Sequence, residues 1–161
     1  MQRILLSPLL LVAILVGVSG PSPAAEAVPV KSATTNLMVP FEQTVTVSTV
    51  WGTTDIDLAG GIHVVSHVVP GGQANVYISL AGMTGTGSDG VMYIGLGAFQ
   101  LTDVLNAEGP PKVNPFTVPF SLVAIGQPAD PDAFLPLNIN FALTFGTTGV
   151  LQSVGYVVLT E

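Results

Sequence analysis

The sequence contains no cysteine and few charged side chains. Its 161 residues include three Lys or Arg against ten Asp or Glu, which gives a formal net charge of −7. Without cysteine the chain can form neither disulfides nor a thiolate metal site, so packing must stabilise it. The acidic balance opposes binding to the phosphate backbone of nucleic acids. Nucleic acid is therefore not an expected partner.

No apolar run is long enough to span a bilayer as a helix. Residues 4–18 are largely apolar, whereas a spanning helix needs about 20 such residues. Helix-breaking Gly20 follows, and residues 25–27, Ala-Glu-Ala, fit the small-x-small rule for signal-peptide cleavage. We predict a signal peptide over residues 1–27, a secreted location, either extracellular or periplasmic, and no stable membrane anchor.

The mature part has the size of a single domain with one core. Residues 28–40 mix Pro, Ser, Thr, Ala and Asn without periodicity, and we expect an extended leader there. Residues 41–161 are expected to form a single β domain. Cleavage removes one basic and one acidic residue, so the net charge stays at −7.

Helical periodicity is missing outside the signal peptide, whereas period-two alternation recurs. Between residues 41 and 51 the odd positions are mostly apolar and the even ones polar, and residues 135–145 alternate in the same way. Such alternation is typical of half-buried strands. Gly60-Gly61 predicts a bulge or bend, and Pro70-Gly71-Gly72 predicts the turn of a hairpin.

Glycine marks further breaks. Residues 82–90 hold four glycines and are expected to be a flexible loop. In the next strand, over residues 91–102, Gly95 and Gly97 indicate a bend or the close approach of another element. Residues 146–149 should turn the chain into a last hairpin.

The chain therefore contains about seven predicted strands, which indicates an all-β fold: an antiparallel β-barrel or a two-sheet β-sandwich. We favour the barrel, because closure removes exposed edges and the chain has few lysines to protect them.

His63 and His67 are the two histidines, and they share one face of a predicted strand. Four residues along a strand span roughly 13 Å, too far for two ligands of one zinc ion. We interpret them as partly buried or cross-strand-paired histidines, although either could ligate a metal together with a carboxylate of a neighbouring strand. With Trp51, the sole tryptophan, they are the candidate ligand-binding residues. We predict no metal site, no cofactor and no catalytic residue.

Two Asp-x-Asp pairs, Asp55 with Asp57 and Asp130 with Asp132, lie in or near predicted loops. Such pairs can bind calcium through oxygen, but neither continues into the glycine and glutamate of a helix-loop-helix calcium site. The glycine-rich segment lacks the lysine and the glycine order of phosphate-binding loops. None of these motifs predicts a site.

A nucleophilic enzyme needs a base, and only the two histidines can serve. No Gly-x-Ser-x-Gly elbow is present. We therefore predict a secreted, non-enzymatic β domain that binds a small apolar ligand or a surface partner. Two alternatives stay open: a hydrolase or isomerase in a barrel mouth that uses His63 or His67, and an outer-membrane β-barrel, for which the aromatic girdles are sparse.

Residues 58–69 (Leu-Ala-Gly-Gly-Ile-His-Val-Val-Ser-His-Val-Val) and 76–87 carry a strand pattern that resembles small secreted bacterial β-barrel-like proteins of unknown function. Residues 116–126 and the hairpin over 137–158 continue the likeness. The resemblance implies a similar fold and no particular activity. Those proteins often contain a cysteine pair that is absent here, so no disulfide is implied for this chain.

Overall fold

The computed structural model describes residues 32–49, 52–105, 112–126 and 134–159. These residues form eight strands and no helix, and hence none that could cross a membrane. The all-β prediction is confirmed. The strands are β1 (Ala33–Thr49), β2 (Gly52–Val68), β3 (Gln73–Gly87), β4 (Met92–Leu96), β5 (Ala98–Val104), β6 (Lys112–Ala124), β7 (Phe134–Phe145) and β8 (Leu151–Leu159).

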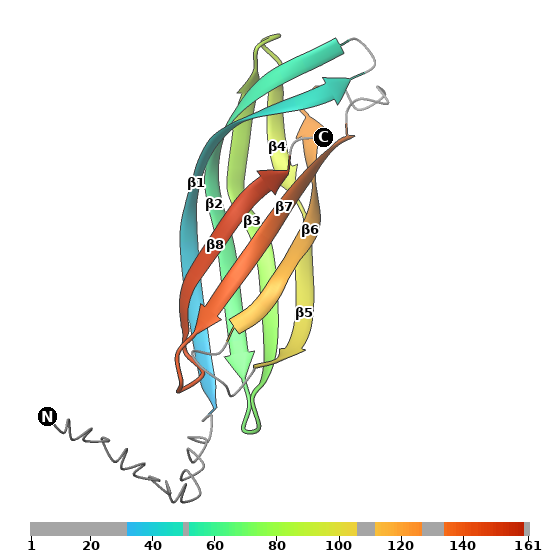
Figure 1. Ribbon diagram of the computed structural model, residues 1–161. Helices are drawn as coiled ribbons and strands as arrows, with labels where there is room; N and C mark the ends of the chain where they lie inside the picture. Colours follow the sequence, from blue (N-terminus) through green and yellow to red (C-terminus); the bar gives the residue numbers. More distant parts are fainter. Residues whose placement is uncertain (1–31, 50–51, 106–111, 127–133, 160–161) are drawn as a thin grey trace, which may run out of the picture.

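The strands form one antiparallel sheet that curls into an elongated, nearly closed barrel (Figure 1). Along the sheet the order is β1-β2-β3-β4-β6-β7-β8, and β5 pairs with β3 beyond the end of β4. Of the two predicted architectures, the structure shows the barrel. The predicted β2–β3 hairpin is confirmed, with the Val69 N–H donating to the Gln73 carbonyl across its turn at 2.9 Å. The register shift predicted at Gly60-Gly61 lies between Ala59 and Gly61.

The strand predicted over residues 91–102 is divided at Gly97, which is why eight strands are present and not about seven. Gly97 has a φ of +137°, a backbone conformation that residues other than glycine rarely adopt. A Cβ at this position would lie 2.8 Å from the Phe120 ring. The predicted bend is therefore confirmed. Beyond this bend, β5 pairs with β3, while β6 pairs with β4 and β7.

The flexible loop predicted over residues 82–90 is wrong for most of its length. β3 continues to Gly87, and the turn is confined to residues 88–90. Gly85 points inward, where a Cβ would lie 2.6 Å from Leu58 Cδ2 and 2.9 Å from the Asp57 carbonyl oxygen. The glycine therefore reflects tight packing between β2 and β3 and not loop flexibility.

β1 begins at Ala33, so residues 33–40 of the expected leader form the first half of this strand. The odd-numbered face of β1 points inward, as the alternation predicts, and Phe41 and Val45 are buried. Trp51 lies outside the described residues.

The inside of the barrel is packed with apolar side chains. The inward face predicted for residues 135–145 is confirmed, because every second residue of β7 is buried. Phe116 of β6 stacks on Phe141 of β7 and on Phe99 of β5. The largest fully buried side chains are those of Phe41, Val45, Ile56, Leu58, Ile62, Ile78, Met83, Leu122, Ile139, Phe141, Leu143 and Phe145.

Gly85→Ala should destabilise the protein by about 1–3 kcal/mol, because the new methyl group meets a backbone oxygen that cannot easily move. Gly155→Ala in β8 is the matched control, since its Cβ would meet Ala142 only at ordinary contact distances, 3.7 Å and beyond. It should be neutral or slightly stabilising. Urea unfolding of both variants measures the difference, and equal stabilities would contradict the tight packing at Gly85.

Candidate functional site

β1 and β8, the first and last strands of the sheet, lie next to each other, and we call the boundary between them the seam (Figure 1). The Leu151 N–H donates to Thr35 Oγ1 at 3.1 Å, and the Tyr156 hydroxyl donates to the Pro40 carbonyl oxygen at 3.1 Å. Both pairs are 116 residues apart, so the two strands run parallel. Among the described residues no backbone ladder joins them.

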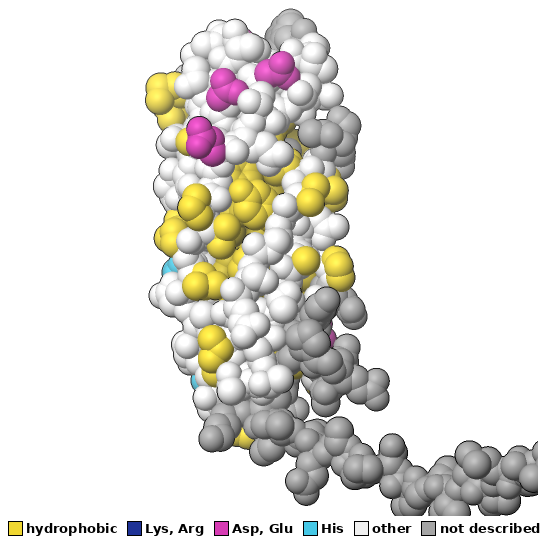
Figure 2. Space-filling view, turned by 60° about the vertical axis from the view of Figure 1, so that its left-hand side comes forward, with side chains coloured by type: hydrophobic (Ala, Val, Ile, Leu, Met, Phe, Trp, Pro, Cys, Tyr) yellow, Lys and Arg dark blue, Asp and Glu magenta, His cyan; other side chains and the backbone are white. Residues whose placement is uncertain are grey.

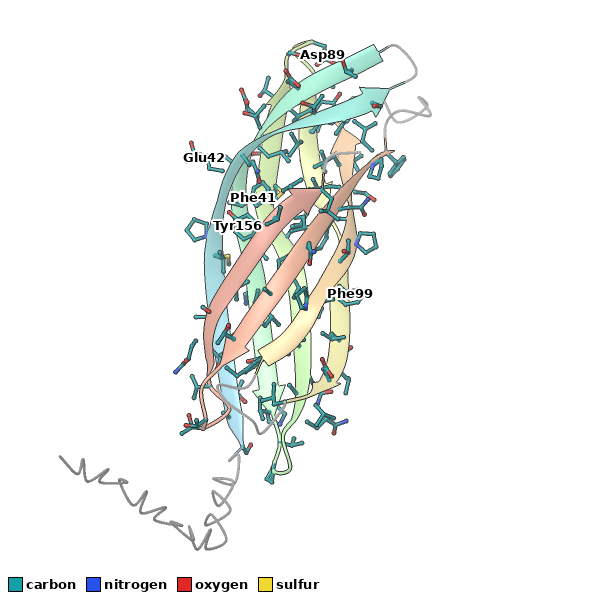
Figure 3. The ribbon with its side chains drawn as sticks, viewed as in Figure 1. Phe41, Glu42, Asp89, Phe99 and Tyr156 are labelled. Carbon is teal, nitrogen blue, oxygen red and sulfur yellow. The ribbon has the colours of Figure 1, made fainter. Side chains whose placement is uncertain are left out.

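Aromatic packing supports the closed part of the seam. The rings of Phe41 in β1 and Tyr156 in β8 are stacked, with centroids 5.4 Å apart and an interplanar angle of 25°. Figure 3 shows the two rings together between the strands, with Glu42 nearby on β1. Tyr156 therefore closes the barrel twice, through its ring and through its hydroxyl.

The seam opens toward the end of β1. The constant offset places Leu159, the last described residue of β8, beside Gln43. Gln43 belongs to the inward-pointing face of β1, yet its side chain is exposed, which marks a gap in the barrel wall. Beyond it, residues 44–48 pair with β2 and with no other strand among the described residues.

A cavity of about 90 Å³ lies at this open part of the seam, and we call it the seam cavity. Three strands line it: residues 45–48 of β1, 136–138 of β7 and 158–159 of β8. Its aliphatic groups include the buried Leu137 and, at the rim, Leu159, which is 42% exposed. None of the described residues that line it is charged. Figure 2 shows hydrophobic side chains gathered along this face of the molecule, with acidic side chains toward its upper end.

Carboxylates occupy the outer face beside the open edge of β1. The Thr44 hydroxyl donates to Asp57 Oδ1 and the Thr46 hydroxyl donates to Asp55 Oδ1, each at 2.6 Å. Glu42 is also exposed on this face. We call Glu42, Asp55 and Asp57 the acidic patch.

Asp55 and Asp57 both belong to the strand β2 and bond to threonines of β1. Asp55 also lies beside the turn at residues 88–90, because its carbonyl oxygen accepts from the Ser88 N–H. Asp130 and Asp132 lie outside the described residues. Within the part of the chain that is described, no three His, Asp or Glu side chains come together in a way that would hold a metal ion.

His63 and His67 lie on the outer face of β2 and do not line the seam cavity. His63 Nε2 is 2.8 Å from Asn36 Oδ1, and His67 Nδ1 is 2.9 Å from Thr34 Oγ1. These cross-strand pairs match the structural role inferred from the sequence. Ser66, between them in the chain, is fully buried on the inner face, so it forms no nucleophile–base pair with either histidine.

No relative was found. No protein-family model matches the chain, and neither a curated protein nor a solved structure matches it. The resemblance to small secreted bacterial β proteins therefore stays a prediction.

Tyr156→Phe should lower the free energy of unfolding by about 0.5–1.5 kcal/mol, because it removes the hydroxyl that bonds Pro40 and keeps the stacked ring. Tyr77→Phe is the matched control: Tyr77 is 44% exposed on β3, and its loss of a hydroxyl should change stability by less than about 0.5 kcal/mol. Denaturant unfolding compares the free energies of unfolding of the two variants. A Tyr156 variant as stable as the control would show that the hydroxyl does not help to close the seam.

Proposed function

We propose that this protein is a secreted, non-enzymatic binding module that takes up an apolar group in the seam cavity. The observation that carries this proposal is a cavity at a gap in the barrel wall, lined among the described residues by six apolar side chains together with Thr46, Ser48 and Asn138, and by no charged one. An apolar cavity of about 150 Å³ can hold benzene. The seam cavity, at about 90 Å³, suits a smaller group such as a short alkyl chain or one apolar side chain.

The surroundings of the cavity extend the apolar surface. Phe134 at the start of β7 is 64% exposed and Val157 in β8 is 63% exposed, and both strands also line the cavity. Large apolar side chains on neighbouring strands are typical of interaction surfaces. This favours a ligand that covers the rim as well as entering the cavity.

The enzyme alternative finds less support. A hydrolase or isomerase built on His63 or His67 needs one of these side chains at the cavity, but both bond to β1 residues on the outer face. The outer-membrane alternative expects a polar interior and an apolar outer band. Here the described inward side chains are apolar apart from a few such as Thr54 and Ser66, and threonine, asparagine and aspartate occupy much of the outer face of β1 and β2.

The affinity for straight-chain 1-alkanols should rise with chain length, by about fourfold for each buried methylene, until the cavity is full. Val158→Phe should abolish this binding, because Val158 lines the cavity and a larger side chain would fill it. Val104→Phe is the matched control, since Val104 in β5 is 61% exposed and does not line the cavity. Chemical-shift titration of the methyl groups measures the alkanol affinity of the parent protein and of both variants. Alkanol affinities that do not depend on chain length, or that both variants lower equally, would refute the proposal.

Replacing both histidines by glutamine separates the binding module from the enzyme. Neither histidine lines the seam cavity, so His63→Gln with His67→Gln should retain the alkanol binding of the parent protein. The same pair of proteins is screened for hydrolysis and isomerisation. A turnover that the parent shows and the double variant loses would favour the enzyme alternative.

A further inference from the structure

We infer that the open edge of β1, over residues 44–48, binds an extended polypeptide in which apolar and basic residues alternate, by adding it to the sheet as a further strand. This inference rests on the proposed function, because an apolar side chain of the bound polypeptide would enter the seam cavity. It adds the chemical class of the ligand and the way in which its backbone is held.

The backbone of β1 presents hydrogen-bonding groups at this edge. The Pro40 carbonyl points away from β2, because it accepts the bond from Tyr156 of β8. Backbone groups alternate in direction along a strand, so those of Thr44 and Thr46 point the same way as those of Pro40. Among the described residues no strand pairs with this edge. Such an edge is a template for another extended chain.

The open part of the edge also lacks the usual protection against pairing. Natural sheets protect edges with proline, lysine or bulges. Pro40, which has no N–H to offer, lies in the part of the seam that β8 covers. Residues 44–48 contain neither proline nor lysine, and their pairing with β2 runs without a register shift. A regular strand therefore faces the gap.

The two faces of this edge differ, and they define the side chains of an added strand. Such a strand would lie about 4.8 Å from β1, with successive side chains pointing to opposite faces. On the inner face they would lie beside Val45 and Val47, which line the seam cavity together with Thr46 and Ser48 of the outer face. On the outer face they would lie beside Thr44 and Thr46, at the acidic patch. The ligand should therefore alternate apolar and basic residues.

Charge complementarity favours a basic ligand over a second copy of this chain. The described side chains include no lysine or arginine, so nothing among them neutralises the acidic patch. Two copies paired edge to edge would place their acidic patches on the same face of the joined sheet. Like charges brought together oppose association, and a chain of net charge −7 adds long-range repulsion.

The test uses a short capped peptide in which lysine and valine alternate, titrated into the full mature chain at low ionic strength. Its binding should shift the amide signals of residues 44–48, and the corresponding glutamate–valine peptide should not bind. Raising the salt from about 0.01 M to about 1 M shortens the Debye length from about 30 to about 3 Å and should weaken the binding of the lysine–valine peptide. Equal binding of both peptides would overturn the inference.

Backbone methylation tests strand addition directly. Along an added strand, only every second N–H points at β1. One peptide is N-methylated at its lysines and a second at its valines, so that each loses one of the two sets of N–H groups. Only one of the two should lose its affinity. A peptide pair in which both bind, or in which both fail while the unmethylated peptide binds, would exclude a ladder with β1.

Charge removal tests the acidic patch. The double variant Asp55→Asn with Asp57→Asn keeps an acceptor oxygen for each threonine. It should lower the affinity for the lysine–valine peptide by about tenfold. Asp103→Asn is the control, because Asp103 lies in β5 opposite Ala74, at the other end of the barrel, and its effect should stay below about twofold. Equal effects of the two variants would show that the peptide responds to net charge alone, and would overturn the inference.

The outcomes separate this inference from the proposed function. If 1-alkanols bind and the lysine–valine peptide does not, the inference fails and the seam cavity keeps its function. If the peptide binds with the methylation pattern of an added strand and alkanols do not bind, the cavity is not a binding site, and both the proposed function and the seating of the peptide side chain in it fail. A dimer in sedimentation that the peptide cannot dissociate would identify a second copy as the occupant and overturn the basic ligand.

Discussion

The parallel direction of β1 and β8 is the constraint on which the other features of this barrel depend. Seven strands follow one another along the antiparallel sheet, because β4 and β5 share the same edge of β3. When an odd number of strands follow one another with alternating direction, the first and the last strand run the same way. Parallel pairing is slightly weaker per residue than antiparallel pairing. Here the closure uses side chains: a threonine, a tyrosine and a stacked pair of rings.

The length of the strands decides where this closure ends. β1 is longer than β8, and the register fixed by Tyr156 leaves the last part of β1 without a described partner across the seam. The seam cavity lies at that point, lined by residues from both faces of β1 and β7 and by the last two described residues of β8. The acidic patch lies on the outer face of the same stretch, where Thr46 both lines the cavity and bonds to Asp55. Edge, cavity and acidic patch thus lie together beside the last described residue of β8.

Much of the fold could be predicted from the sequence because its local signals are strong. The alternation over residues 135–145 and the turn at Pro70-Gly71-Gly72 each correspond to a feature of the structure. Gly85 misled the prediction, because a glycine that is needed for close packing looks the same in sequence as one in a loop. β1 also begins earlier than predicted, since alternation is weak between residues 33 and 40.

The seam cavity had no counterpart in the sequence analysis. Its lining comes from three strands that are far apart in the chain, and the residues are ordinary ones such as Val45, Leu137 and Val158. Only the pairing of all the strands brings them together. The two histidines are distinctive in the sequence because they are rare, whereas the cavity is lined by residue types, such as valine and leucine, that are common throughout the chain.

The seam also determines how the barrel would respond to mechanical load. Because β1 and β8 are parallel neighbours, the start of β1 and the end of β8 lie toward opposite ends of the barrel (Figure 1). Tension between these two points would pull the strands past each other lengthwise, so the Thr35–Leu151 and Pro40–Tyr156 contacts would be strained together and not one after the other. This strand boundary, which has no backbone ladder among the described residues, is therefore loaded in shear, the direction in which its contacts act together.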